Sequence, residues 1–414
     1  MAVPYDVLWA QGNANKRAPT TSELLNGHAC GPADPDLEDY LKHQLQQTQN
    51  NFALQLTYAA SQLGLGYDPA GEDQLYRILQ SYADIIKQDM AISVPEDYPT
   101  IIDAMNYLSN YRIIEGVTVV ISVASNTYNH GDAVIPGHPD GDKILVQGAS
   151  LPLGMVSAGD FAVTGADASS RNADRITNDA MLRARFPTRI VTSGDAVAVG
   201  GNHIRLKNLV FIGDGDSDGL KASEGGSIEC ENVAVHYYAN GMLTDDGGRI
   251  DAPYCSVSGC TENGATTSRN GVIVLDNGIA SGCTGQGIQA SFGGHINFIQ
   301  GISKGNGSTG VLVSFAGSVQ ALSSEADANG AIGYSVSNGG IIQAKQSTAT
   351  ANPTIAYFVN GNGTINAIES TATGSATAYK AQESGYIEAT SVGGTTTYSP
   401  TKNAVGNGNA YIKG

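Results

Sequence analysis

Charged residues, and basic ones in particular, are scarce in this sequence. Of the 414 residues, 15% are Asp, Glu, Lys or Arg; 39 are acidic and 22 basic, so the net charge is −17. Nucleic acids and anionic membrane surfaces are bound through clusters of cationic side chains. We therefore expect neither as a partner, and the charge provides no attraction toward acidic polysaccharides.

Long apolar runs are also absent. No stretch approaches the about 20 consecutive apolar residues that a membrane-spanning helix needs, so we expect no membrane insertion. The first residues, MAVPYDVLWAQGNANKRAP, lack a basic segment followed by an apolar one. This predicts that there is no signal peptide and that the chain is made in the cytoplasm.

Motifs of common enzymes and cofactor sites are missing. The sequence has no P-loop, no G-x-S-x-G, no H-E-x-x-H and no C-x-x-C, and its seven histidines are dispersed. Its five cysteines form no paired framework. We expect no cofactor, with calcium as the one exception considered below.

What the sequence does contain is a repeat. SVQALSSEADANGAIGYSVSNGG (318–340) is followed by IIQAKQSTATANPTIAYFVNGNG (341–363), and both segments share apolar positions and end on Gly. Cutting the chain in both directions gives nine consecutive units of 22–24 residues between 203 and 409. A period of this length indicates a solenoid, in which each unit buries its apolar residues against the next.

The apolar positions of the units fall into columns. The second position is always Ile or Val and the fourth is also apolar, with mostly polar residues between them, which is the alternation of a half-buried strand. Stacked units of this kind predict a mainly β protein, a right-handed parallel β-helix, preceded by an N-terminal α-helical segment. The second-position residues are Ile204, Ile228, Ile250, Ile273, Ile296, Val319, Ile342, Ile365 and Ile387.

Aromatic and sulfur-containing residues also recur at fixed positions. Tyr334, Tyr357 and Tyr379 occupy equivalent positions of their units, and we expect them, like Phe292 and Phe315, to pack inside. Cys260 and Cys283 share position 12. They are interpreted as buried thiols, with a disulfide between neighbouring coils as the alternative.

The segment before the coils is predicted to be helical over residues 1–91. PADPDLEDYLKHQLQ carries a stripe of leucines that continues loosely to Leu56, and EDQLYRILQSYADIIKQD is a second amphipathic pattern. Such stripes pack on other copies of the chain or on another protein. An ordinary helical domain with its own core is the alternative.

Residues 92–202 form the transition to the regular coils. VPEDYPTIIDAMNYLSNYRI predicts a helix that covers the open end of the solenoid, and GVTVVISVASNTY and DKILVQGAS read as its first strands. Residues 151–190 interrupt the pattern as a long insert, within which RNADRITNDAMLRARFP suggests a short basic helix. The regular β-helix of nine coils then occupies residues 203–414.

Together, VPEDYPTIIDAMNYL, VTVVISVASNTY, ILVQGA, the insert ending in LRARFPT and the Gly-closed coils resemble bacteriophage tail fibre and tailspike proteins with a pectin-lyase-like β-helix. The resemblance covers about residues 92–414. It implies a virion protein that is a homotrimer, docks through its N-terminal region on phage tail or baseplate proteins, and turns its β-helix toward polysaccharide of the host surface.

Four carboxylates are candidates for catalysis of glycan cleavage, which usually needs an acidic pair. Glu229 and Asp251 occupy the same position of successive coils, so they should lie one strand spacing apart. Asp245 and Asp246 lie between them in the sequence, near the end of the coil that contains Glu229. Because Arg205 precedes Glu229 in this column, ion pairing along the sheet is the alternative interpretation.

The stretch DGDSDGLKASEGG partly matches a calcium-binding loop. Its candidate ligands are Asp214, Asp216, Asp218 and Glu224. Glu224 lies one residue before the expected position, and a solvated turn is the alternative.

Tyrosines and a histidine supply the candidate glycan-binding site. Exposed aromatic rings stack on sugar rings, and His236, Tyr237 and Tyr238 interrupt a coil of small residues, with Tyr254 in the next coil. Packing of these rings in the core is the alternative.

Three functions remain open from the sequence. The first is a tail fibre or spike component that binds host glycan without cleaving it, the second a tailspike polysaccharide depolymerase acting as hydrolase or lyase, and the third a purely structural tail decoration.

Overall fold

The computed structural model describes residues 85–150, 186–394, 397–399 and 410–414. The chain divides into two units, Met1–Ile85 and Ile86–Gly414. The helices predicted for the N-terminal region and for the insert at 151–190 lie almost wholly outside the described residues.

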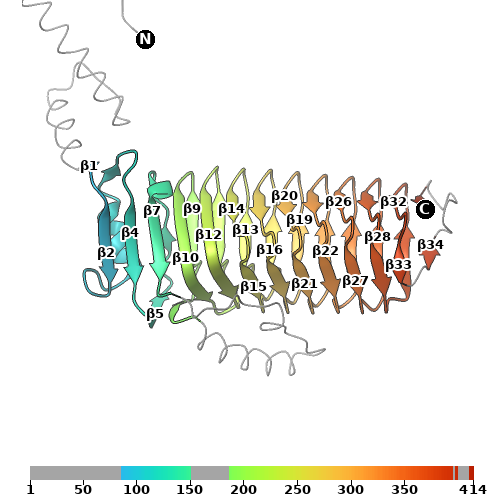
Figure 1. Cartoon of the computed structure of the whole chain (residues 1–414), viewed down its shortest axis with the longest axis horizontal. Helices are drawn as coiled ribbons and strands as arrows, with labels where there is room; N and C mark the ends of the chain where they lie inside the picture. Colours follow the sequence, from blue (N-terminus) through green and yellow to red (C-terminus); the bar gives the residue numbers. More distant parts are fainter. Residues whose placement is uncertain (1–84, 151–185, 395–396, 400–409) are drawn as a thin grey trace, which may run out of the picture. The chain divides into compact units, whose positions relative to one another are not determined.

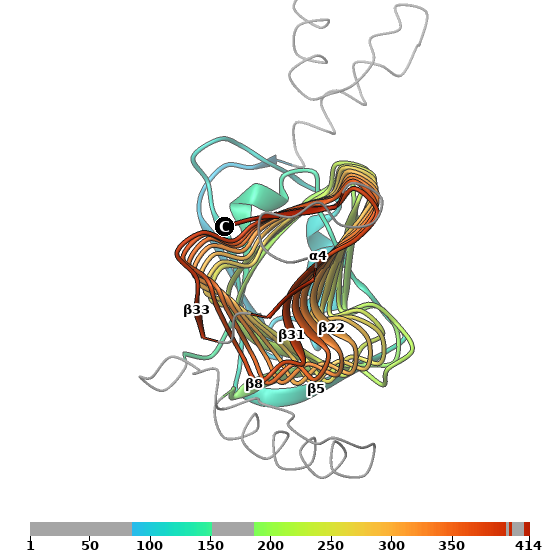
Figure 2. The ribbon, with the colours of Figure 1, turned by 90° about the vertical axis from the view of Figure 1, so that its right-hand side faces the viewer.

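The second unit is a parallel β-helix, as the repeat predicts. Successive coils lie side by side in Figure 1 and overlie one another when viewed along the stack in Figure 2. Residues one repeat apart are paired in parallel, for example Ile273 with Ile296 and Ile296 with Val319. Each regular coil contributes three short strands.

The first strand of each coil pairs with its equivalents to form one continuous face. β10 and β12 are long enough to contribute to the second face as well. The strands are β2 (Met90–Val94), β4 (Val119–Val123), β7 (Ile144–Gly148), β10 (His203–Ile212), β12 (Ser227–His236), β14 (Arg249–Asp251), β17 (Val272–Val274), β20 (His295–Asn297), β23 (Ser318–Gln320), β26 (Ile341–Gln343), β29 (Thr364–Asn366), β32 (Tyr386–Glu388) and β35 (Tyr411–Lys413).

The second strands form another face of the stack. They are β5 (Asn126–Gly131), β8 (Thr188–Thr192), β15 (Ser256–Ser258), β18 (Ile279–Ser281), β21 (Ile302–Lys304), β24 (Glu325–Asp327), β27 (Thr348–Thr350), β30 (Thr371–Thr373) and β33 (Gly393–Gly394).

The third strands form a separate 11-stranded sheet. They are β6 (Ile135–Pro136), β9 (Val197–Gly200), β11 (Leu220–Ser223), β13 (Met242–Thr244), β16 (Ala265–Thr267), β19 (Ile288–Ala290), β22 (Thr309–Val313), β25 (Ile332–Val336), β28 (Ile355–Val359), β31 (Thr377–Ala381) and β34 (Tyr398–Ser399).

The interior is filled by the predicted columns. All nine second-position residues from Ile204 to Ile387 are at most 1% exposed. Tyr334, Tyr357 and Tyr379 form the predicted buried stack, with ring centroids 5.1 Å apart at each step. Their hydroxyls bond Ser324, Ser347 and Ser370, respectively, so no buried phenol in this stack lacks a partner.

A polar column crosses the same interior at position 12. Nδ2 of Asn306 donates to Oδ1 of Asn329 over 2.9 Å, and Nδ2 of Asn329 donates to Oδ1 of Asn352 over 3.1 Å. In the preceding coils this position holds Cys283 and Cys260, which are buried free thiols. The interpretation of these cysteines as buried thiols is therefore confirmed.

The N-terminal end of the stack is covered by a helix, as predicted. α4 (Ile101–Leu108) begins at Thr100, whose side chain accepts from the N–H of Asp103, and its buried residues include Ile101 and Leu108. A small sheet of β1 (Ile85–Ile86) and β3 (Arg112–Ile113) and the short helix η2 (Gly141–Lys143) lie in the same part of the chain.

Two boundaries of the sequence interpretation are wrong. The insert expected at 151–190 overlaps β8, which begins at Thr188 and pairs with β5. The helix pattern EDQLYRILQSYADIIKQD runs to Asp89, but Ile85–Ile86 is a strand that pairs with β3, and β2 begins at Met90. Pairing with a neighbouring strand overrides the local helical periodicity there. None of the helices in the described part of the chain has the length and hydropathy of a membrane span.

The turn from the third strand to the next coil has an unusual backbone. Its two central residues both have positive φ, as in Asn338 (49°) and Gly339 (77°). Asn and Gly favour this conformation because it crowds larger side chains. Two successive coils nevertheless place phenylalanine there, Phe292 and Phe315, both with φ of 47°.

Candidate functional site

The four candidate catalytic carboxylates are all held by cations. Glu229 and Asp251 are in register on β12 and β14, as predicted. Nε of Arg205 lies 3.3 Å from Glu229, and Arg249 donates two hydrogen bonds to Asp251, of 2.7 and 2.6 Å. The ion-pairing alternative thus accounts for this face.

Asp245 and Asp246 share one arginine. Both carboxylates contact the guanidinium of Arg269, which lies 2.8 Å from Asp246. Asp245 also accepts a 2.8 Å hydrogen bond from the hydroxyl of Ser268. These contacts give the two aspartates a structural role in the turn.

The candidate calcium ligands do not converge. Oδ1 of Asp214 accepts from the N–H of Asp216 over 3.1 Å, a local turn contact, whereas Asp218 pairs with Lys221 at 3.1 Å. Glu224 lies in a turn with φ of 52°. Within the described ranges, no group of three or more His, Cys, Asp or Glu side chains is placed to hold a metal ion.

Two of the four predicted glycan-binding residues are in the core, which corrects the sequence interpretation. Tyr238 is fully buried and its hydroxyl lies 2.8 Å from that of Thr192; burial raises the pKa of this phenol. His236 is also buried, with Nδ1 2.5 Å from the Ser258 hydroxyl. Neither ring is available to a sugar.

The other two residues reach the surface. Tyr237 is partly buried, and Tyr254 is 55% exposed in a turn with φ of 58°. Of the four predicted glycan-binding residues, Tyr254 is therefore the one whose ring is most accessible to a sugar.

The aromatic surface that the sequence interpretation missed is formed by Phe292 and Phe315. They were expected inside, but they are 59% and 50% exposed. Their rings stack with centroids 4.8 Å apart and an interplanar angle of 1°. Periodicity could not detect this, because alternation applies to strands and these residues lie in the turn.

Polar groups begin three residues after each ring. His295 follows Phe292 and Ser318 follows Phe315, at the starts of β20 and β23. Nε2 of His295 donates to Oδ1 of Asn297 over 2.8 Å, which leaves Nδ1 to accept from the Ser318 hydroxyl at 2.7 Å. On the side of β20 and β23, the phenylalanine stack is thus bordered by neutral hydrogen-bonding groups.

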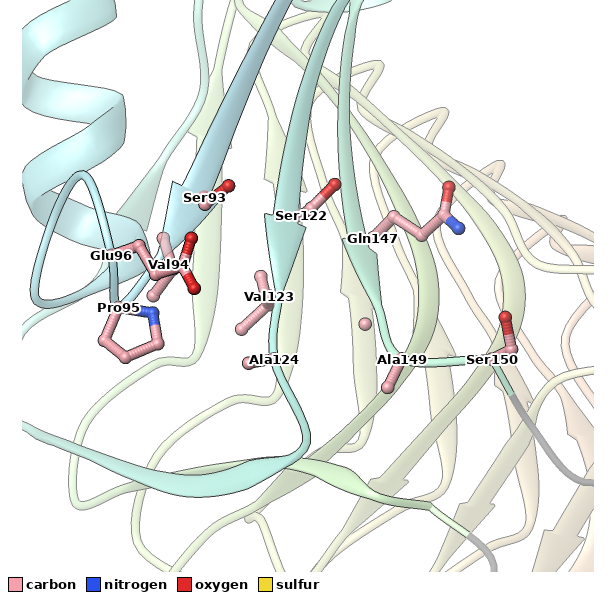
Figure 3. A pocket seen from close by; sticks show the side chains of 11 residues that line it. Ser93, Val94, Pro95, Glu96, Ser122, Val123, Ala124, Gln147, Ala149 and Ser150 are labelled. Atoms are coloured by element: carbon pink, nitrogen blue, oxygen red, sulfur yellow. The ribbon is translucent and has the colours of Figure 1, made fainter.

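A shallow groove lies on the first coils (Figure 3). Ser93, Ser122 and Gln147, in register on β2, β4 and β7, point into a space of about 360 Å³. Glu96 is the charged residue in its wall. Its lining also includes Ser150, the last residue described before the insert.

Comparisons with known proteins identify no family. No family model and no curated protein matches the sequence. Solved structures that are similar to this chain include two modules of mannuronan C-5 epimerases from Azotobacter vinelandii. The AlgE4 A-module has a TM-score of 0.46 and 14% identity over 75% of this chain and 97% of its own. The AlgE6 A-module has 0.41 and 13% over 72% and 91%. The fold assignment rests on the strand pairing described above.

Proposed function

We propose that this protein binds glycan through the outer surface of its β-helix and does not cleave it. The observation that carries the proposal is the exposed stack of Phe292 and Phe315. Both phenylalanines have a left-handed backbone conformation, which costs about 1–3 kcal/mol for a non-glycine residue. The rings are 59% and 50% exposed and fill no part of the core, although the equivalent turn is closed elsewhere by Asn338, which supports a role in binding.

A sugar ring is the ligand that this surface fits. One face of a pyranose is lined by C–H groups and its rim carries hydroxyls, so it pairs with a flat aromatic ring that has polar neighbours. The apolar area at Phe292 and Phe315 is limited to two rings, much smaller than the core of a stable protein interface. Tyr254 offers a further exposed ring one coil before that of Phe292, in the turn between β14 and β15.

Glycan cleavage is the second candidate function. Its support is the register of Glu229 and Asp251, which places two carboxylates one coil apart, the spacing of a retaining pair. The arginines on both residues favour the binding role, because one member of such a pair must donate a proton.

The biological setting of the proposal comes from the resemblance to tail fibres and tailspikes. In that setting the chain is a homotrimeric virion protein, attached to the phage tail through its N-terminal region, and the glycan belongs to the host surface. Immunogold labelling of purified particles tests the location, and light scattering of the full chain tests the trimer. A monomeric chain absent from particles would contradict this setting without affecting glycan binding.

The test of binding uses the full chain and an array of bacterial surface polysaccharides. The informative variant is Phe292→Asn with Phe315→Asn, because Asn338 already occupies the equivalent turn position. We expect at least tenfold weaker retention from the loss of two stacking contacts of about 1 kcal/mol each, with an unchanged fold. Phe292→Tyr with Phe315→Tyr is the matched control and should retain binding.

Product analysis separates the candidate functions. Incubation with the retained polysaccharide should leave its chain length unchanged. If the wild type shortens the polysaccharide and Glu229→Gln does not, the protein is an enzyme instead. Retention by no polysaccharide would overturn the proposal and leave the structural tail decoration.

A further inference from the structure

The first face of the stack contains a strip without charged residues. The outward side chains of β17, β20, β23, β26 and β29 include no Asp, Glu, Lys or Arg. Ion pairs bracket the strip, Arg249 with Asp251 before it and Lys413 with Glu388 after it, each at 2.6 Å. The outward residues are Val272, Val274, His295, Asn297, Ser318, Gln320, Ile341, Gln343, Thr364 and Asn366.

Four side-chain amides form a column along this strip. Asn297, Gln320, Gln343 and Asn366 are paired in register, so they recur once per coil, about every 4.8 Å. No hydrogen bond joins the side chains of Gln320 and Gln343 to another described residue. Each amide both donates and accepts, which is the pairing that a sugar hydroxyl requires.

The amide column and the phenylalanine stack run along the same coils. Phe292 lies in the turn that leads into β20, and Phe315 in the turn that leads into β23. An apolar edge and a hydrogen-bonding face therefore extend in parallel along the coil axis.

By itself the strip is too small to hold a second copy of the chain. Five strands span roughly 19 Å along the axis, and a three-residue strand is roughly 10 Å long, giving an area on the order of 200 Å². A stable protein interface needs about 800 Å² from each partner. An extended oligosaccharide matches the length and the width.

We infer that the glycan is an uncharged, linear polysaccharide that lies along the coil axis, with its hydroxyls on the amide column and its C–H groups against the exposed edges of Phe292 and Phe315. This inference rests on the proposed glycan binding. Its additional content is the absence of charge on these five strands: their outward side chains offer no cation to a carboxylate or sulfate, and the net charge of −17 repels acidic chains.

The test is affinity electrophoresis, which measures how strongly a polysaccharide in the gel retards the full chain. The neutral probes are dextran, mannan and galactan, and the acidic probes are polygalacturonate and alginate; the polysaccharide array is used in parallel. We expect retention by neutral glycans that is insensitive to salt. Gln320→Ala with Gln343→Ala should weaken it roughly 25-fold, about fivefold for each lost amide. Gln346→Ala, an exposed amide in the next turn, is the matched control.

The outcomes distinguish the inference from the proposed function. Tighter retention by acidic glycans, lost in Phe292→Asn with Phe315→Asn but unchanged in the glutamine variant, would overturn the neutral ligand and keep glycan binding. Retention by no glycan would overturn both. If the glutamine variant instead dissociates an oligomer in light scattering without glycan, the strip is a contact between copies and the inference is wrong.

Discussion

Arg112 and Asp140 tie the segment after the capping helix to the coil that it covers. Nε of Arg112 donates to Oδ2 of Asp140 over 2.8 Å, and the same oxygen accepts from the N–H of Ile113 at 3.0 Å. Burial alone would raise the pKa of Asp140, but these bonds and the nearby Lys143 outweigh it and lower the pKa to about 2.

We therefore expect Asp140→Asn to destabilise the β-helix by about 2 kcal/mol at neutral pH, since one pKa unit corresponds to about 1.4 kcal/mol. The contribution is complete above the ordinary carboxyl value of 3.8 and is lost as the pH falls through about 2. Denaturant unfolding at several pH values measures it. Asp142→Asn, an exposed neighbour, is the control, and equal effects of the two variants would contradict the assignment.

His138 makes the same region sensitive to mild acid. Its Nε2–H donates to the carbonyls of Leu108 (3.2 Å) and Tyr111 (3.1 Å), and its Nδ1 accepts from the N–H of Asp140 (2.9 Å). Burial lowers the pKa of His138, because the charged ring would lose solvation and the bond at Nδ1.

The unfolded chain therefore binds the proton more readily than the folded one, so stability falls as the pH drops below about 6.5. His138→Gln should be less stable at pH 7.5 and should lose part of the acid slope. The unfolding midpoint measured from pH 7.5 to pH 5 checks this. Identical slopes in the variant and the wild type would show that other groups carry the effect.

Ile296 tests the inward column. It is fully buried between Ile273 and Val319, so Ile296→Asp places a charge among apolar neighbours and should cost several kcal/mol. Asn297→Asp, one residue along the same strand and facing outward, should be nearly neutral. A melting temperature of Ile296→Asp close to that of the wild type would contradict the assigned face.

The phenylalanine turns predict a gain in stability. Asn tolerates a positive φ better than Phe, so Phe292→Asn should leave the melting temperature unchanged or raise it, although the stacking contact with Phe315 is lost. Differential scanning calorimetry measures the change. A loss of several kcal/mol would show that the ring supports the fold and would weaken its assignment to ligand binding.

Much of this architecture could be predicted from the sequence, because a solenoid repeats its inward positions at a constant interval. Ile296 and its equivalents, the tyrosine stack and the register of Glu229 with Asp251 all follow from counting residues within the repeat. The helical interpretation failed at Ile85–Ile86, where pairing with β3 decides the conformation.

The aromatic residues show which side-chain positions the repeat predicts and which it does not. Tyr238 occupies position 12, the column that continues with Cys260 and Cys283, so its burial could have been found from its register. Phe292 and Phe315 could not, because they occupy turn positions with a left-handed backbone, where neither strand alternation nor side-chain propensity indicates which way a ring points.

The constant register of the coils also means that this molecule can change length in whole steps. Deleting residues 318–340 would join Gly317, the end of one coil, to Ile341, the start of another. It would also place Asn306 next to Asn352 in the buried amide column. Such a deletion removes one strand from each of the three faces. The number of coils therefore sets the length of the uncharged strip, and with it the length of glycan that the strip can bind.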